Sequence, residues 1–107
     1  MKEPITERLD PLIHERVRLG ILTLLSVHGT LDFKTLKESL NVTDGNLSQH
    51  LRKLEEGGYI EVHKQFVKRR PKTTYSLTEL GRERLADYIE KLEKILKEVK
   101  NAGKTGR

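Results

Sequence analysis

The stretch that most constrains the fold is a run of leucines at helical spacing near the middle of the chain. Leu47, Leu51 and Leu54 recur at positions i, i+4 and i+7, which places them on one face of a helix. Thr43 precedes this run and has the short side-chain acceptor of a helix N-cap. Gly57 follows it and suits the left-handed conformation that ends many helices. The sequence therefore predicts an amphipathic helix between Thr43 and Gly57.

The face opposite these leucines is polar. At about 100° per residue, it carries side chains that can hydrogen-bond to base edges or phosphates, and a glycine that lets a backbone approach closely. The pattern is compatible with an ordinary solvated helix face or with a helix that contacts DNA. If the helix contacts DNA, the candidate residues are Thr43, Asp44, Gly45, Asn46, Ser48, Gln49, Arg52 and Lys53.

A predicted β-hairpin follows this helix directly. Residues 59–66 alternate loosely as a strand, Lys68–Lys72 form a basic turn that contains a proline, and Thr73–Leu77 return as a β-branched strand. Residues 62–78 contain no acid, and their five basic residues equal the net charge of the whole chain, +5. Basic turns are often merely solvated, but positive charge concentrated in one hairpin also suits a phosphate backbone. The candidate contacts are Lys64, Lys68, Arg69, Arg70 and Lys72.

In this order, the pieces resemble the winged helix-turn-helix transcription regulators of the MarR and ArsR kind, including PadR-like repressors. The matching residues lie within 12–90 and are Leu47-Ser48-Gln49-His50-Leu51, Leu54-Glu55-Glu56-Gly57-Gly58-Tyr59-Ile60, the basic turn, Tyr75-Ser76-Leu77-Thr78 and Gly81. The resemblance implies a winged helix-turn-helix whose wing is the hairpin. It also implies a transcriptional regulator that binds double-stranded DNA sequence-specifically, with residues 43–53 in a major groove and the wing on the backbone or in the minor groove.

The remaining elements give an α+β, mostly helical fold. Residues 1–10 are expected to be an extended arm and residues 11–79 the DNA-binding domain. Asp10 and Pro11 have the signature of a helix start, so the first helix is predicted from Pro11 to Val27. Thr30-Leu31 is a short predicted strand that could pair with the wing. Asp32 then caps a second predicted helix over residues 33–40.

Thr78 caps a final helix that is predicted over residues 79–101 and is long for so small a chain. Apolar residues recur along it every seven positions, and others fill the alternate positions. Such a stripe often packs on the chain's own core, which suits its first half. Its second half extends beyond a three-helix core, so residues 80–101 are predicted to form a homodimer with help from the first helix, and residues 102–107 a frayed tail. The predicted dimer residues are Leu12, Ile13, Tyr88, Ile89, Leu92, Ile95, Leu96 and Val99.

The sequence gives little support for catalysis or metal binding. The chain has no cysteine, and its four histidines lack metal-ligand spacing, so no metal, cofactor or enzymatic activity is predicted. Metal-sensing ArsR relatives use cysteines before the turn, or Asp and His on the last helix, and this chain has neither set. Without a signal peptide or membrane-spanning run, a cytoplasmic protein is expected. Two alternatives stay open: a winged helix that binds another protein, and one that binds RNA.

Overall fold

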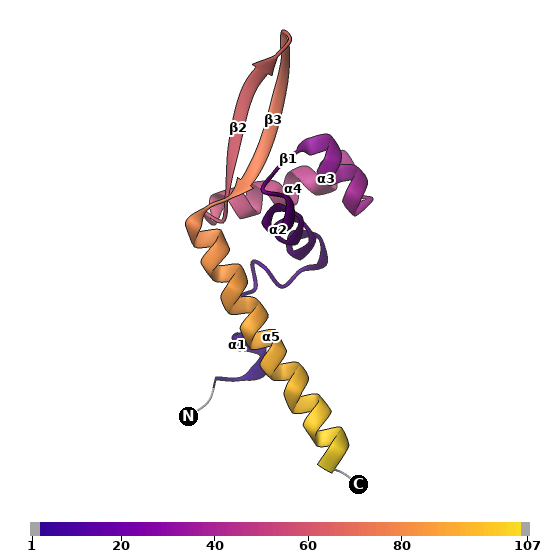
Figure 1. Cartoon of the computed structure of the whole chain (residues 1–107), viewed down its shortest axis with the longest axis vertical. Helices are drawn as coiled ribbons and strands as arrows, with labels where there is room; N and C mark the ends of the chain where they lie inside the picture. Colours follow the sequence, from indigo (N-terminus) through magenta and orange to yellow (C-terminus); the bar gives the residue numbers. More distant parts are fainter. Residues whose placement is uncertain (1–2, 106–107) are drawn as a thin grey trace.

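The computed structural model describes the backbone of residues 3–105 and the side chains of residues 3–103. The molecule is elongated, with principal extents of 64 × 27 × 22 Å, and the β-hairpin wing and the C-terminal helix point to opposite ends (Figure 1). This architecture confirms the predicted winged helix-turn-helix with a long C-terminal helix. Its elements are α1 (Ile5–Arg8), α2 (Arg16–His28), β1 (Thr30–Asp32), α3 (Phe33–Leu40), α4 (Asp44–Glu56), β2 (Ile60–Val67), β3 (Arg70–Leu77) and α5 (Glu79–Thr105).

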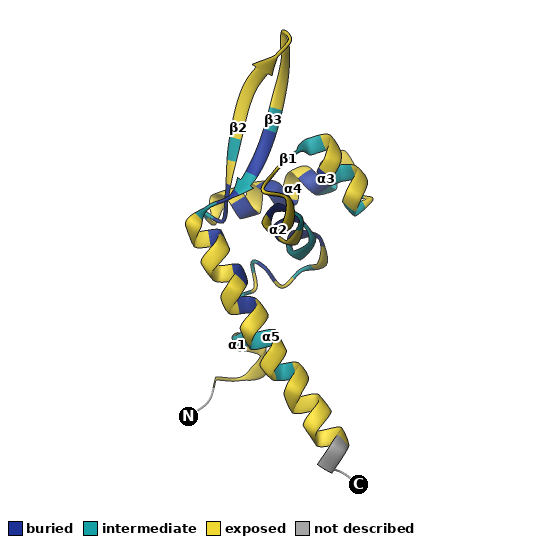
Figure 2. Ribbon diagram, in the orientation of Figure 1, coloured by how far each residue is buried: buried dark blue, intermediate teal, exposed yellow. Residues whose placement is uncertain are grey.

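The hydrophobic core lies where α2, α3 and α4 meet the base of the sheet. The predicted leucine stripe of α4 is buried in it, since Leu47, Leu51 and Leu54 each expose 4% or less. Ile21 of α2 and Leu36 of α3 are fully buried against the same cluster. The first half of α5 closes the core, whereas the outer wing and the far end of α5 are exposed (Figure 2). Burial of this stripe leaves the polar face of α4 free.

The sheet is antiparallel with strand order β1-β3-β2. The predicted strand at Thr30 pairs with β3 as expected, from Thr30–Ser76 to Asp32–Thr74. β2 and β3 pair as far as Val67–Arg70, so only Lys68 and Arg69 form the turn, both with positive φ (52° and 67°). The predicted turn over residues 68–72 was therefore too long. Pro71 belongs to β3 beyond the segment that β1 covers, where the strand has a free edge that tolerates proline.

Helix α2 begins at Arg16 and not at the predicted Pro11. Glu15 is the N-cap, and its carboxylate accepts hydrogen bonds at 2.9 and 2.8 Å from two N–H groups of the first turn. Asp10 instead closes a separate turn, in which its side chain accepts from the N–H of Leu12 at 2.9 Å. The Asp-Pro pair thus marks a turn, and the helix start lies one turn later.

Both ends of the chain are more helical than predicted. The arm expected over residues 1–10 contains the short helix α1, over Ile5–Arg8. The last helix continues past the predicted end at residue 101 as far as Thr105, so most of the predicted frayed tail is helical. Residues 1–2 and 106–107, on which the rest of these two predictions falls, lie outside the described residues.

Helix α4 ends in a Schellman motif in which Gly58, and not the predicted Gly57, takes the left-handed conformation. The φ of Gly58 is 81°, whereas Gly57 stays in the right-handed region at −76°. The N–H groups of Gly58 and Tyr59 donate to the carbonyls of Glu55 and Leu54 at 3.0 and 2.9 Å. This motif turns the chain sharply from the end of α4 into β2.

Helix α5 starts against that same turn. The hydroxyl of Thr78 accepts from the N–H of Gly81 at 2.9 Å, as predicted for a helix cap, and donates to the carbonyl of Gly58 at 2.6 Å. A Cβ on Gly81 would overlap the carbonyl oxygen of Tyr59, so only glycine fits there. The starts of the wing and of α5 are thereby fixed to the end of α4.

Candidate nucleic-acid interface

Helix α4 presents most of the predicted DNA-contacting residues to solvent. Thr43 is its N-cap, as predicted, and its hydroxyl accepts a hydrogen bond from the N–H of Asn46 at 3.1 Å. Asn46 itself is half-buried. Gly45 has no neighbour within 4 Å of where a Cβ would stand, so the first turn is open to another molecule. Asp44 forms an ion pair with Lys37 of α3 at 2.8 Å, which offsets its negative charge. The exposed residues are Thr43, Asp44, Gly45, Ser48, Gln49, Arg52 and Lys53.

A buried polar cluster, which the sequence prediction missed, fixes how α4 lies on α2. His50 is 9% exposed, and its Nδ1 accepts a hydrogen bond from the Arg18 guanidinium at 3.0 Å. Arg18 is equally buried and also donates to the carbonyl of Leu12 at 2.6 Å. Burial lowers the pKa of His50; the nearby Glu15 carboxylate, 3.6 Å from Nδ1, opposes this and the Arg18 charge reinforces it. His50 is therefore held neutral, as an acceptor for Arg18.

A cleft of about 240 Å³ separates α4 from the wing. We call it the helix–wing cleft. Arg52 and Lys64 line it with positive charge, and Glu55 is the acid in its lining. Burial, and then the charge of Glu55, raise the pKa of Tyr75 at its base. Its polar lining consists of Ser48, Arg52, Glu55, Lys64, Thr73 and Tyr75.

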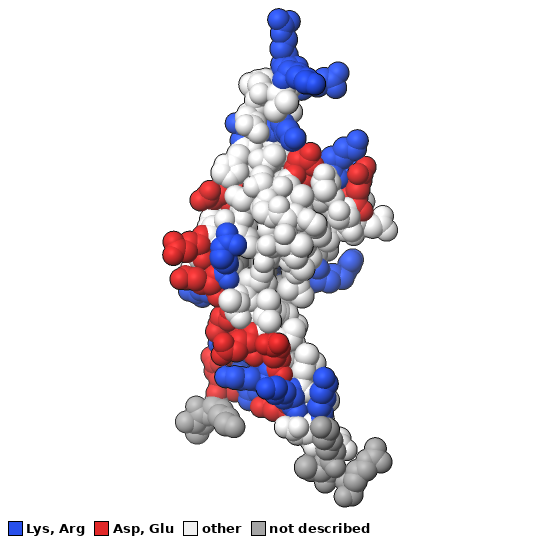
Figure 3. Space-filling view, in the orientation of Figure 1, with Lys and Arg blue, Asp and Glu red and all other residues white. Residues whose placement is uncertain are grey.

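The five basic residues of the wing are all exposed, but they do not share one face. The register pairs Lys64 with Thr73, and both line the helix–wing cleft. Arg70 and Lys72 alternate with the cleft residues of β3 and so belong to the opposite face. Lys68 and Arg69 form the tip, which is the basic end of the molecule (Figure 3). The wing can thus meet negative charge on either side and at its end.

The predicted dimer residues divide into two groups. Ile13 and Tyr88 are buried within the chain itself, at 0% and 2% exposure, because the Tyr88 hydroxyl bonds to Nδ1 of His14 at 2.7 Å and both side chains join the core. These two residues have no surface left for a partner. The others are half-buried or exposed: Leu12, Ile89, Leu92, Ile95, Leu96 and Val99.

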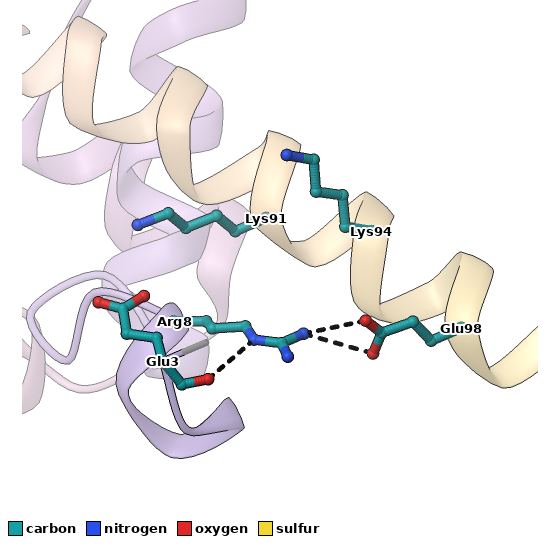
Figure 4. A pocket seen from close by; sticks show the side chains of 5 residues that line it. All are labelled: Glu3, Arg8, Lys91, Lys94 and Glu98. Carbon is teal, nitrogen blue, oxygen red and sulfur yellow. Dashed lines mark hydrogen bonds and ion pairs between the residues drawn. The ribbon is translucent and has the colours of Figure 1, made fainter. Parts of the chain in front are cut away.

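A second hollow, of about 360 Å³, lies between α1 and α5 (Figure 4). Arg8 projects across it and donates to both carboxylate oxygens of Glu98 at 3.2 and 3.3 Å. Lys91 and Lys94 extend from α5 along the same hollow, and Glu3 closes its other side. The Arg8–Glu98 ion pair holds α1 on α5. Because positive and negative side chains are mixed in this hollow, it does not form a basic surface like that of the wing.

The described residues contain neither a cluster of metal-ligating side chains nor a membrane-spanning helix. Among residues 3–103, no three His, Asp or Glu side chains gather closely enough to hold a metal ion. Within the described part of the chain, no helix is both long and apolar enough to cross a membrane.

Comparison with known proteins now identifies the class. Residues 17–96 match the family described as winged helix DNA-binding domain. Protein MJ0432 of Methanocaldococcus jannaschii, itself uncharacterized, is 43% identical over 83 residues, which cover 78% of this chain and 90% of that protein. A solved transcriptional regulator homologue from Pyrococcus horikoshii OT3 has a TM-score of 0.81 and 27% identity, over 89% of this chain and 92% of its own.

A less similar solved structure comes from the MarR family, one of the families that the sequence motifs resemble. The solved structure of a putative MarR-family regulator from Enterococcus faecalis V583 has a TM-score of 0.70 at 24% identity, over 86% of this chain and 82% of that one. At this identity the likeness shows the shared fold alone. The chain belongs to the winged helix DNA-binding domain family, and its structural neighbours are transcriptional regulators and not enzymes.

Proposed function

We propose that this protein is a transcriptional regulator that binds double-stranded DNA sequence-specifically as a homodimer. The observation that carries the proposal is the helix–wing cleft, where the free polar face of α4 meets a basic wing whose residues 62–78 contain no acid. A face of this kind beside concentrated positive charge fits a groove and its bordering phosphates. The family match supports DNA as the partner.

Two exposed side chains of α4 suit direct contact with bases. Gln49 and Arg52 lie opposite the buried leucines, and their side chains can form bidentate hydrogen bonds to adenine and guanine in the major groove. Gly45 and Ser48 leave the first two turns free to approach the DNA backbone. In this arrangement α4 lies in a major groove and its first turn points toward the duplex.

The strand of DNA that borders this groove would then run through the helix–wing cleft. Ser48 and Thr73 offer hydroxyl donors to its phosphates, and Arg52 and Lys64 offer charged donors. Glu55, which is exposed, places one negative charge in the same lining, close enough to Tyr75 to raise its pKa. Beyond that strand lies the adjacent minor groove, which the outer wing with Lys68 and Arg69 would reach.

The second half of α5 is the proposed dimer element. Ile89, Leu96 and Val99 expose 47%, 49% and 66% of their surfaces on a helix that is otherwise strongly charged. A two-fold contact would bury the same apolar strip on both copies and place two α4 helices at a fixed spacing. The half-buried Leu92 and Ile95 would extend this contact, whereas Ile13 and Tyr88 stay in the core. A cytoplasmic location remains part of this proposal.

The experiment that tests the proposed function is selection of bound duplexes from a random DNA pool. We expect an enriched, palindromic motif whose half-sites lie about one helical turn apart. Duplex RNA of the same length serves as competitor, because an RNA-binding winged helix would be displaced by it. Failure to enrich any duplex above the starting pool would exclude sequence-specific DNA binding and favour a protein-interaction role.

A further inference from the structure

Phe66, near the tip of the wing, is the most exposed large apolar side chain among the described residues. It is 77% exposed on a strand with no core beneath its outer half. Its cross-strand partner is Pro71, which is also exposed. No part of the core covers this ring, so most of its surface is free to contact another molecule.

The strand register shows which way this ring faces. Side chains at alternate positions of β2 share a face, so Phe66 lies on the face of Lys64, which lines the helix–wing cleft. At about 3.4 Å per residue, Phe66 lies about 7 Å further out than Lys64. That distance matches the width of a minor groove, about 6 Å. If a DNA strand occupies the cleft, the ring lies over the minor groove next to it.

The tip holds the ring in place and surrounds it with positive charge. Lys68 and Arg69 form a two-residue turn with positive φ, which matches the twist of the hairpin and keeps the two strands paired to Val67–Arg70. All five basic residues of the wing lie within six positions of Phe66: Lys64, Lys68, Arg69, Arg70 and Lys72. An apolar ring within such a cluster matches the surface of DNA, whose phosphates flank stacked bases.

We propose that Phe66, backed by Pro71, is an apolar wedge that enters the minor groove and partly unstacks one base step. This inference rests on the proposed DNA binding and adds a mechanism for reading sequence by deformability. Steps that unstack readily, such as TA and CA, would be preferred under the wing although no hydrogen bond reads them. A second copy of the chain is the less suitable partner, because it would present a wing of the same charge.

The test uses the full-length protein and its selected duplex, with 2-aminopurine replacing adenine at one position at a time under the wing. This base becomes more fluorescent when it unstacks. We compare the parent protein with Phe66→Ala and with Phe66→Leu, which keeps an apolar wedge. Val67→Ala is the matched control, since Val67 is an exposed apolar neighbour on the opposite face of β2. Sedimentation of each variant shows whether assembly is altered.

With the parent and with Val67→Ala, fluorescence should rise at one step, and with Phe66→Leu it should rise partially. Phe66→Ala should abolish the rise and weaken binding by roughly tenfold, a loss typical of one aromatic contact with bases. If the parent binds the duplex tightly without any rise, or Phe66→Ala binds as the parent does, the wedge is refuted while DNA binding stands. A Phe66→Ala variant that changes only sedimentation would identify a protein contact and also overturn the wedge. If the parent protein binds no DNA, the proposed function itself fails.

Discussion

Removal of two wing charges gives the most direct measure of phosphate contact. In the double variant Arg69→Ala, Arg70→Ala, both side chains are exposed, so the fold should be unaffected. Each lost phosphate contact removes about 0.9 from the slope of log affinity against log salt, so the slope should flatten by about 1.8. Between 50 and 200 mM salt, the affinity of the variant should then fall about twelvefold less than that of the parent.

Titrations of a fixed duplex at four or more salt concentrations, followed by fluorescence anisotropy, measure both slopes. The matched control is Lys97→Ala, Lys100→Ala, which removes the same charge from exposed positions in the last part of α5. That part of α5 points away from the wing (Figure 1). The slope of this control should equal that of the parent, because those residues lie far from the wing. Equal slopes for the parent and the wing variant, or an equal flattening in the control, would refute phosphate contact by these two arginines.

Four further predictions concern the helices and the fold. Gln49→Ala should weaken binding to a selected duplex by roughly 1–3 kcal/mol more than binding to random DNA. Equal losses of affinity on both duplexes would mean that Gln49 contacts only the DNA backbone. Gly81→Ala should destabilise by roughly 3 kcal/mol or more in urea unfolding, since its methyl group meets a backbone carbonyl. The pKa of His50 is lower in the folded protein than in the unfolded chain, so protonation of His50 at low pH favours unfolding. The stability that neutral His50 contributes should therefore be complete above about pH 6.5 and decline below it, and this decline should be missing in His50→Gln. Leu96→Glu with Val99→Glu should sediment as a monomer that keeps its helical circular dichroism, and a persistent dimer would exclude α5 as the interface.

The parts of the fold that were predicted correctly depend on local signals. Leu47, Leu51 and Leu54 define the buried face of α4 by their spacing alone. Thr43 and Asp32 each cap the helix that follows them, because a cap needs only a short acceptor and nearby N–H groups. The same spacing also predicted the candidate site, because the residues of α4 opposite these leucines are exposed.

The errors arise where tertiary contacts decide between local options. Asp10 and Glu15 can both cap a helix. The structure has a turn at Asp10 that leads Ile13 into the core, so the helix begins only after Glu15. Tyr88 fits a dimer seam by its spacing, yet its hydroxyl finds a partner within the chain. His50 lies three residues after Leu47 and so could have been placed on the buried stripe, but its partner in α2 is 32 residues away.

The segment between Asp10 and Arg18 joins the two surfaces that the proposed function requires. Asp10 accepts a hydrogen bond from the tyrosine that follows α4, His14 bonds to Tyr88 of α5, and Arg18 bonds to His50 of α4. One short stretch therefore holds the proposed DNA-reading helix and the proposed dimer helix by side-chain hydrogen bonds. In a two-fold dimer, the angle between these helices determines the distance between the two copies of α4, and this distance must match the half-site spacing of the DNA. In the proposed dimer, the half-site spacing would therefore depend on this segment as well as on the residues that touch DNA.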